Sequence, residues 1–393
     1  MIGFDYVNRT RIIFGKEKEN EVGNILSSYG FKRVLVTYGG GSVKKSGLLQ
    51  KVLESLDEKD IFHVEFGGIL PNPIREYSKK GVEIARLNKV DCILAIGGGS
   101  VIDVSKSIAA SFDYDGDPFD FNLKKVAPSS ALPIGVVLTI AAAGSESSTS
   151  CVIQDEKTGV KQGFNSDLVR PLFAIENPEL TFGVSAYQTA CGITDIMMHS
   201  LERYFNESGP FELSDEWALA LVKNVMAAGI TALKNPCDYD ARAALMLDSS
   251  LSHDGLTSLG KKSVFVVHPL EHAISGYKKE VAHGAGIAVC YLGWAKYWVN
   301  KKPEKFAHLA ERLFNIHGES TLETAIMGVA SFEKFYKSIG MPTSLNELGL
   351  SEADIPSLVK IATGNGTRVV GLCPEPLNEK AVDEIYRNCL IKN

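Results

Sequence analysis

The chain has 393 residues, which is long enough for two compact domains rather than one. Its apolar content of 45% and charged content of 22% are ordinary for a soluble globular protein. A net charge of −6 without a basic block argues against nucleic acid as a main partner.

The cysteine pattern and the apolar runs bear on the cellular compartment. The seven cysteines are odd in number and form no C-x-x-C pair, which is typical of a reduced, cytosolic protein. The first fifteen residues lack the apolar block of a secretory signal. The longest apolar stretch, 131–144, is too short to span a membrane and contains Pro133. We therefore expect a soluble, cytoplasmic protein that does not cross a membrane.

Up to about residue 180, short β-rich runs alternate with stretches of helical periodicity. Buried strands joined by helices predict a parallel, doubly wound sheet of the Rossmann type. The β-rich runs are 33–38, 62–68, 91–100, 132–140 and 171–180, and the helical stretches between them are 46–56, 75–88 and 101–111.

From Ser185 onward the β signal fades, and long segments with helical periodicity follow at 214–233, 240–252 and 286–298. A turn signal at Asn177-Pro178 follows the last expected strand. The sequence thus predicts an α/β dinucleotide-binding domain over 1–180 and an all-α metal-binding domain over 181–393.

Two glycine loops, each reading GGGS, follow expected strands and precede helical patterns, at 39–42 and 97–100. Glycine lets the backbone approach a ligand closely, and a helix N-terminus offers unpaired N–H groups to phosphate. Tight strand-to-helix turns need glycine in any case, and neither loop reads G-x-G-x-x-G or G-K-[ST]. Two such loops in one doubly wound sheet nevertheless favour a bound dinucleotide.

The first loop also bears on which dinucleotide binds. NAD-preferring sites commonly place an Asp or Glu against the adenosine ribose. Here the end of the first strand carries only glycine, Ser42 and the pair Lys44-Lys45. This leaves room and positive charge for a 2′-phosphate, so NADP(H) is favoured, with NAD(H) as the alternative.

A third polar cluster follows the run 132–140. Thr139 precedes the segment 141–148, whose small residues can cap a helix or bond a ribose and an amide. Ser145 and Ser148 are the candidate contacts, and Glu146 is expected to cap. Lys161 is a plausible cationic contact, with an ordinary surface lysine as the alternative.

The helical half carries residues in metal-ligand spacing. Asp195 and His199 are four residues apart, so they share one face of a helix and can close on one ion. His268, His272 and His283 follow, interrupted by Pro269, which is tolerated mainly at a helix start. We expect His268 to end a loop, His272 to lie in the first helical turn, and His283 to open the next helix.

One carboxylate with histidines forms a mixed oxygen and nitrogen ligand set that suits one divalent ion, Fe(II) or Zn(II). Any one of these histidines alone would more often be a packed or surface residue. Five candidate groups are one too many for a tetrahedral site, so one of them is available for chemistry instead of binding.

Taken together, the motifs FGK, VTYGGGSVKKSG, GGILPNP, AIGGGSVIDVSK, GSES, GITDIMMH, HPLEH and AHG make the chain resemble the iron-containing (group III) alcohol dehydrogenases. The similarity is greatest to their butanol-dehydrogenase-like branch, which includes NADPH-dependent aldehyde reductases. The resemblance implies a dehydroquinate-synthase-like architecture with the active site in a cleft between two domains. It also implies a homodimer acting on a small alcohol or aldehyde.

The resemblance further implies that Asp195, His199, His268 and His283 hold the metal, and that His272 lies by the nicotinamide as a catalytic or proton-relay group. Ser42 and Lys45 would lie beside the 2′-phosphate, and the second loop would hold the pyrophosphate. The full predicted cofactor-binding set is Gly40, Gly41, Ser42, Lys45, Asn72, Gly97, Gly98, Gly99, Ser100, Asp103, Thr139, Ser145, Ser148 and Lys161.

The chain departs from the branch pattern near the expected cleft. Ala143 stands where a Thr is common, Ser148 where an Asn often follows, and His253-Asp254 where Asn-Gly is usual before Gly255. These departures bear on the substrate and leave the chemistry unchanged. Alcohol/aldehyde oxidoreduction fits every feature, whereas a dehydroquinate-synthase-type lyase would need more basic residues, and a non-catalytic metal protein would not need a dinucleotide site.

Overall fold

The computed structural model describes residues 1–207, 213–371 and 374–391. The chain forms two compact units. We call Val7–Val184 with Cys237–Asp254 the sheet unit, and Met1–Tyr6 with Ser185–Pro236 and Gly255–Asn393 the helical unit. A single boundary at residue 180 does not separate these units, chiefly because Cys237–Asp254, in the C-terminal half of the chain, folds with the sheet.

Within the described residues, the main sheet has six strands, and every neighbouring pair is parallel. Its four inner strands are buried on both faces, as their near-continuous runs of Val, Ile and Leu require, whereas its two edge strands are partly exposed. The strand order is β1 (Arg11–Phe14), β8 (Phe173–Glu176), β5 (Ile134–Leu138), β4 (Cys92–Gly97), β2 (Arg33–Gly39) and β3 (Phe62–Ile69).

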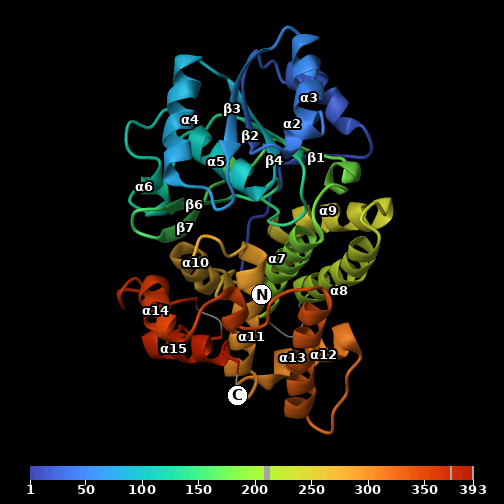
Figure 1. Cartoon of the computed structure of the whole chain (residues 1–393), viewed down its shortest axis with the longest axis vertical. Helices are drawn as coiled ribbons and strands as arrows, with labels where there is room; N and C mark the ends of the chain where they lie inside the picture. Colours follow the sequence, from blue (N-terminus) through green and yellow to red (C-terminus); the bar gives the residue numbers. More distant parts are fainter. Residues whose placement is uncertain (208–212, 372–373, 392–393) are drawn as a thin grey trace. The chain divides into compact units, whose positions relative to one another are not determined.

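Helices cover both faces of this sheet, which confirms the predicted doubly wound fold (Figure 1). Alternate residues of β2 point into the two apolar cores, one on each face of the sheet. Val34 and Val36 pack with α1 (Val22–Ser28) and α3 (Leu48–Asp57), and Leu35 packs with α4 (Arg75–Leu87) and α5 (Gly99–Ser111).

Several features of the sheet unit were not predicted. An antiparallel hairpin joins β6 (Ser150–Asp155) to β7 (Val160–Asn165). Its strands are half-polar, so they lack the apolar runs that identified the others. Helix α9 (Tyr239–His253) belongs to this unit although it lies in the helical half of the sequence. The short elements are η1 (Lys18–Glu21), α2 (Ser42–Lys45), α6 (Phe119–Asn122), η2 (Asp167–Val169) and η3 (Pro178–Thr181).

The helical unit is all-α in its described part, as predicted. Helix α11 (His283–Trp298) is its central element, buried along most of its length and in contact with α7, α10, α13 and α15. The other helices are α7 (Ala186–Tyr204), α8 (Leu213–Lys234), α10 (Val267–Tyr277), α12 (Pro303–Phe314), α13 (Thr321–Ser338), α14 (Ile355–Thr363), α15 (Glu379–Asn388), η4 (Leu256–Ser258), η5 (Asn346–Leu348) and η6 (Glu352–Asp354).

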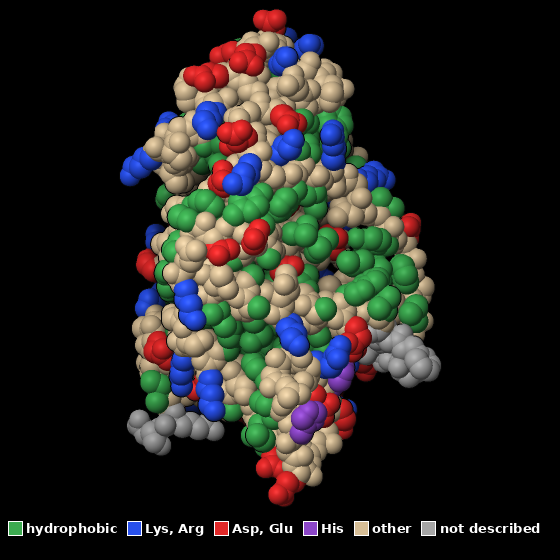
Figure 2. Space-filling model, turned by 90° about the vertical axis from the view of Figure 1, so that its right-hand side faces the viewer, with side chains coloured by type: hydrophobic (Ala, Val, Ile, Leu, Met, Phe, Trp, Pro, Cys, Tyr) green, Lys and Arg blue, Asp and Glu red, His purple; other side chains and the backbone are tan. Residues whose placement is uncertain are grey.

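Among the described residues, α8 is the one helix long and apolar enough to cross a membrane by length and composition. It packs along α7, and a core helix of a globular protein passes the same test, so this is weak evidence for a membrane span. On the face in Figure 2, acidic and basic side chains are interspersed, with apolar side chains between them.

Candidate metal and cofactor sites

Helix α7 carries the first two candidate metal ligands in its buried middle. Asp195 and His199 are both buried, and Oδ1 of Asp195 lies 3.6 Å from Nδ1 of His199. The hydroxyl of Ser185 accepts the N–H of Gln188 and caps the helix. The start of the helix is thereby fixed, and with it the face on which the two ligands project.

The other candidates lie at the starts of α10 and α11. His268 belongs to the first turn of α10, which corrects the expectation that it ends a loop. Pro269 also stands in this turn, where its missing N–H leaves no helical bond unmade. His272 consequently lies one turn further along, beyond the first turn in which it was expected. His283 opens α11, as the spacing predicted.

The ring nitrogens of three histidines converge on one carboxylate oxygen. Oδ1 of Asp195 lies 3.4 Å from Nε2 of His268 and 3.8 Å from Nε2 of His283, in addition to its contact with His199. Metal bonds of about 2.1 Å in a tetrahedral arrangement separate ligand atoms by about 3.4 Å. Asp195, His199 and His268 offer ligand atoms that all lie within 4.8 Å of one another, which suits one ion. Since His283 also lies 3.8 Å from the shared oxygen of Asp195, the four groups surround one carboxylate oxygen and have the chemistry of an Fe(II) or Zn(II) site.

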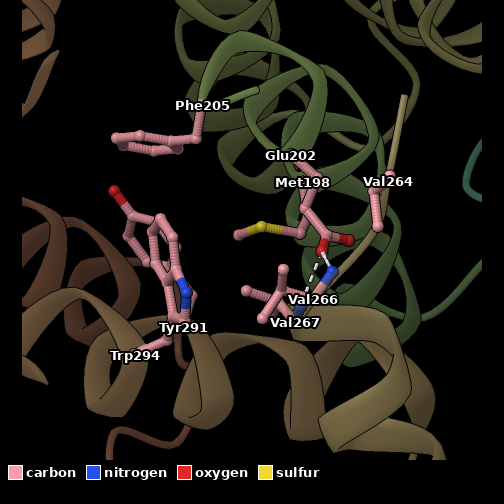
Figure 3. Close-up of a pocket in the computed structure, with 8 residues that line it drawn as sticks. All are labelled: Met198, Glu202, Phe205, Val264, Val266, Val267, Tyr291 and Trp294. Carbon is pink, nitrogen blue, oxygen red and sulfur yellow. Dashed lines mark hydrogen bonds between the residues drawn. The ribbon is translucent and has the colours of Figure 1, made fainter. Parts of the chain in front are cut away.

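Two buried glutamates hold the imidazole rings. Nδ1 of His268 donates to Glu202, and Nδ1 of His283 donates to Glu271. Glu202 also accepts the backbone N–H groups of Val266 and Val267, toward which its carboxylate turns in Figure 3. With Nδ1 engaged, each ring presents Nε2 toward Asp195, which is the arrangement that fixes the tautomer of a metal-binding histidine.

The protonation of His268 reflects these neighbours. Burial lowers its pKa, but Glu202 and Asp195 together outweigh burial and raise the pKa to about 9. A small cavity beside Glu202 is lined in part by Met198, Tyr291 and Trp294 (Figure 3). Its volume of about 10 Å³ holds roughly one water molecule, so it is no substrate pocket.

His272 lies beside the cluster, one helical turn beyond His268 on α10. Its ring stacks on that of His283 with centroids 5.5 Å apart and is 6.4 Å from the ring of His268. Its donor atom, together with those of Glu271 and His283, forms a second close group of possible ligands. Unlike Asp195, His199 and His268, it is only half-buried, which gives it access to solvent.

The glycine loops occupy the switch point of the sheet. Strand β2 lies between β4 and β3, so the chain leaves β2 in one direction and later returns on its other side. Ligands of doubly wound sheets bind at the carboxyl ends of such neighbouring strands. The loop of Gly40, Gly41 and Ser42 follows β2, and the loop of Gly97 to Ser100 follows β4.

The two loops differ in how much space surrounds them. A Cβ at Gly40 or Gly41 would meet no heavy atom within 4 Å. A Cβ at Gly98 would come within 2.2 Å of Ile140, and one at Gly99 within 3.0 Å of Ala143. The first loop is therefore open, whereas the second is packed against the segment that follows β5.

The third polar segment is placed differently from the expectation. Thr139 follows β5, and its N–H donates to the carbonyl of Gly97 at the end of β4. No helix follows this segment, so Glu146 caps none: it is buried, and the chain continues into β6. Ser145 and Ser148 are also buried, and their hydroxyls bond within the unit, to Asp103 and Lys106.

Asp103 and the remaining candidates complete the set. Both carboxylate oxygens of Asp103 are engaged, by Ser145 and by the N–H of Val152, so this side chain shapes the segment. Asn72 follows the carboxyl end of β3, and Lys161 donates to its side-chain oxygen at 3.0 Å. The candidates thus lie after β3, β2, β4 and β5, which are consecutive in the sheet, and on β7.

The two lysines of the first loop have different surroundings. Lys44 lies 5.0 Å from the ring centroid of Tyr38, whose hydroxyl donates to Glu65. Lys45 is exposed and makes no side-chain hydrogen bond or ion pair with the described residues. Lys45 is therefore the cation of this loop that can meet a ligand without first losing a protein contact.

The sequence reasoning missed the two glutamates that hold the histidines. Glu202 follows His199 by three residues and Glu271 follows His268 by three, so each shares a helix face with a candidate ligand. A charged residue within an apolar helix was the available signal. The actual pairing is between helices, since Glu202 bonds His268 and Glu271 bonds His283.

The fold and the cluster define a class of oxidoreductase in which a doubly wound sheet with paired glycine loops is joined to an all-α part carrying an Asp/His cluster. The family description "Iron-containing alcohol dehydrogenase" matches residues 9–178, and its C-terminal counterpart matches residues 189–390. The chain therefore belongs to the iron-containing alcohol dehydrogenase family.

Individual relatives extend over the whole chain. It is 37% identical to NADH-dependent butanol dehydrogenase A of Clostridium acetobutylicum, over 98% of this chain and 99% of the relative. It is 35% identical to the NADPH-dependent aldehyde reductase YqhD of Escherichia coli, over 94% and 95%. The crystal structure of NADH-dependent butanol dehydrogenase A from Thermotoga maritima matches with a TM-score of 0.95 at 34% identity, covering 99% of each chain.

Proposed function

We propose that this oxidoreductase is metal-dependent and NADP(H)-linked and interconverts primary alcohols and aldehydes such as butanol and butanal. The observation that carries the proposal is the convergence of one carboxylate oxygen and three imidazole nitrogens in a member of this family. The printed names of the relatives, butanol dehydrogenase and aldehyde reductase, support the substrate class.

In this proposal Asp195, His199, His268 and His283 hold one Fe(II) or Zn(II) ion. When bound, such an ion supplies Lewis-acid polarisation of a substrate oxygen. Glu202 and Glu271 keep His268 and His283 in the tautomer that offers Nε2. The two glutamates hold these rings through buried hydrogen bonds, which cost free energy to break.

The proposed cofactor site is the row of loops at the ends of β3, β2, β4 and β5. When bound, the dinucleotide supplies the hydride acceptor or donor. The second loop, at the N-terminus of α5, suits the pyrophosphate. The names of the relatives divide between NADH and NADPH, so the proposed preference for NADP(H) rests on the first loop. There, Ser42 and the uncommitted Lys45 stand with no acidic side chain in 39–42.

His272 is the proposed proton-transfer group. It is half-buried and its ring contacts that of His283. An imidazole there can pass a proton between the substrate oxygen and solvent or a ribose hydroxyl. It would act without being a ligand.

The test is an assay of the purified chain loaded with Fe(II) or Zn(II). We expect aldehyde-dependent oxidation of NADPH, lost on chelation and restored by metal, with a higher kcat/KM for NADPH than for NADH. A lyase of the dehydroquinate-synthase type is the second candidate, and none of the relatives named above supports it. Phosphate release from a phosphorylated sugar acid, without turnover of any alcohol or aldehyde, would favour the lyase.

We also propose a cytoplasmic homodimer whose partner is the small-molecule substrate alone. Light scattering during size-exclusion chromatography would give the mass, with twice the 42.6 kDa of one chain expected. A monomer mass at assay concentration would contradict the dimer.

A further inference from the structure

A hydrogen-bond chain inside the sheet unit links α9 to the segment after β5. Ser249 accepts the N–H groups of Ala142 and Gly144, both at 3.2 Å. Its own hydroxyl donates to Oε1 of Glu146 at 3.1 Å. Both lone pairs and the single hydrogen of this hydroxyl are therefore used.

The next serine meets two carboxyl groups. Oγ of Ser250 lies 2.8 Å from Oε1 of Glu146 and 2.7 Å from Oε1 of Glu176. A serine hydroxyl has one hydrogen, and an ionised carboxylate only accepts. Two ionised glutamates could not both bond to Ser250, so one of the two carboxyls must carry the other hydrogen.

The surroundings favour Glu176 as the protonated member. Glu146 accepts from Ser249 as well and lies near the buried ammonium of Lys106. Glu176 is fully buried, and its Oε2 has no hydrogen-bond partner among the described residues. A buried charge without partners is costly, whereas a buried neutral acid is much less so. Burial and the nearby Glu146 raise the pKa of Glu176 to about 8.

We propose that Glu176 is a neutral carboxylic acid that donates to Ser250, and that Glu176 and Ser250 are positioning residues for the loop 141–148. The bonds then run in one direction, from Glu176 through Ser250 to Glu146. Glu146 in turn holds Ser249 against the loop backbone. The part of the proposal that concerns cofactor rests on the proposed function.

The loop is closely fitted to α9 and to the second glycine loop. Gly144 has a positive φ of 61°, and a Cβ there would come within 2.5 Å of the Ser249 carbonyl oxygen. On the other side, Ala143 borders Gly99 and Ile140 borders Gly98. Releasing the loop from α9 therefore disturbs the glycine loop proposed to hold the pyrophosphate.

The protonation state is tested by infrared spectroscopy on protein with ¹³C-labelled glutamate near neutral pH. We expect the carbonyl band of a protonated carboxyl in the wild type and its loss in Glu176→Gln. Absence of the band from the wild type, or its persistence in Glu176→Gln, would overturn the assignment. This measurement needs no cofactor, so it separates failure of the inference from failure of the proposed function.

The positioning role is tested by NADPH titration followed by nicotinamide fluorescence. Glu176→Gln retains a donor without charge and should keep the Kd within about two-fold, whereas Glu176→Leu and Ser250→Ala should raise it roughly ten-fold, the equivalent of a lost buried hydrogen bond. kcat should change less than Kd. Equal weakening by Glu176→Gln and Glu176→Leu would overturn the role.

Ser107→Ala is the matched control for these variants. The Ser107 hydroxyl is buried in the same unit and has no hydrogen-bond partner among the described residues. Its removal should leave Kd unchanged. A shift in Ser107→Ala as large as that in Ser250→Ala would mean that loss of any buried hydroxyl suffices, and would also overturn the positioning role.

Discussion

Glu202 on α7 accepts the Nδ1–H of His268 on α10, which leaves Nε2 of that ring 3.4 Å from Oδ1 of Asp195. The buried carboxyl group of Glu202 is hydrogen-bonded to the ring and to backbone N–H groups, which offsets the cost of burying it. The pair thus orients a candidate ligand across two helices.

Glu202→Gln should weaken metal binding while leaving the ligands in place. The amide cannot accept from both the ring and the backbone, so His268 is less firmly oriented, and loss of such a partner lowers metal affinity roughly 10- to 100-fold. Competition with a coloured chelator measures the affinity for Zn(II). Glu280→Gln, at an exposed acid shortly before His283, is the control and should bind as the wild type does. Unchanged affinity in Glu202→Gln would remove this role.

His268→Ala should abolish metal content and turnover together. The substitution removes one of three imidazole nitrogens around Asp195, and the remaining groups no longer complete a tetrahedral set. Elemental analysis of the protein after metal loading measures this. Full occupancy in His268→Ala would show that the ion is held elsewhere.

His272→Ala should keep its metal and lose activity. The ring stacks on that of His283, and loss of a positioned proton-transfer group lowers kcat by roughly 10²–10⁴. NADPH affinity should stay within a few-fold, and the deficit in kcat should shrink as pH rises because hydroxide can substitute. A metal-free His272→Ala would make it a ligand, and an unchanged kcat would make it a packing residue.

Lys45→Ala should raise the KM for NADPH roughly ten-fold, since a hydrogen bond to a charged group is lost, and should leave the KM for NADH within about two-fold. Lys44→Ala is the control, because that lysine lies against Tyr38. Gly40→Asp should also disfavour NADPH, through charge alone, since a side chain there meets open space. A wild type that prefers NADH would contradict this interpretation of the loop.

Glu176→Gln should stabilise the fold more at neutral than at acidic pH. The pKa of Glu176 is raised to about 8 from an ordinary value of 4.5, so between these values the folded chain keeps a proton that the unfolded chain releases. Wild-type stability therefore falls as pH rises through this window, by up to about 3 kcal/mol between pH 5 and pH 7. Gln does not titrate, so its Tm advantage over the wild type should grow with pH. A constant difference would contradict a neutral Glu176.

Local periodicity allowed much of the fold to be predicted from the sequence. Apolar runs identified β2, β4, β5 and β8, because strands buried on both faces need continuous apolar residues. The β-rich run 62–68 identified β3, although this edge strand is partly exposed. The four-residue spacing of Asp195 and His199 placed both on one helix face, and that inference needed no tertiary information. The hairpin of β6 and β7 escaped notice because its half-polar strands carry no such run.

Only the tertiary structure decided which helices pack against each other and which buried side chains pair. That Glu202 bonds His268, and not a residue of its own helix, follows from how α7 and α10 pack, which no spacing within either segment reveals. Helix α9 has the same periodicity as its neighbours in sequence, yet it folds with the sheet unit, where Gly144 leaves room for it and buried carboxyls bond its serines. A sequence fixes the periodicity of each element, but the partner of a buried charge depends on contacts between residues far apart in the chain, where burial makes an unpaired group costly.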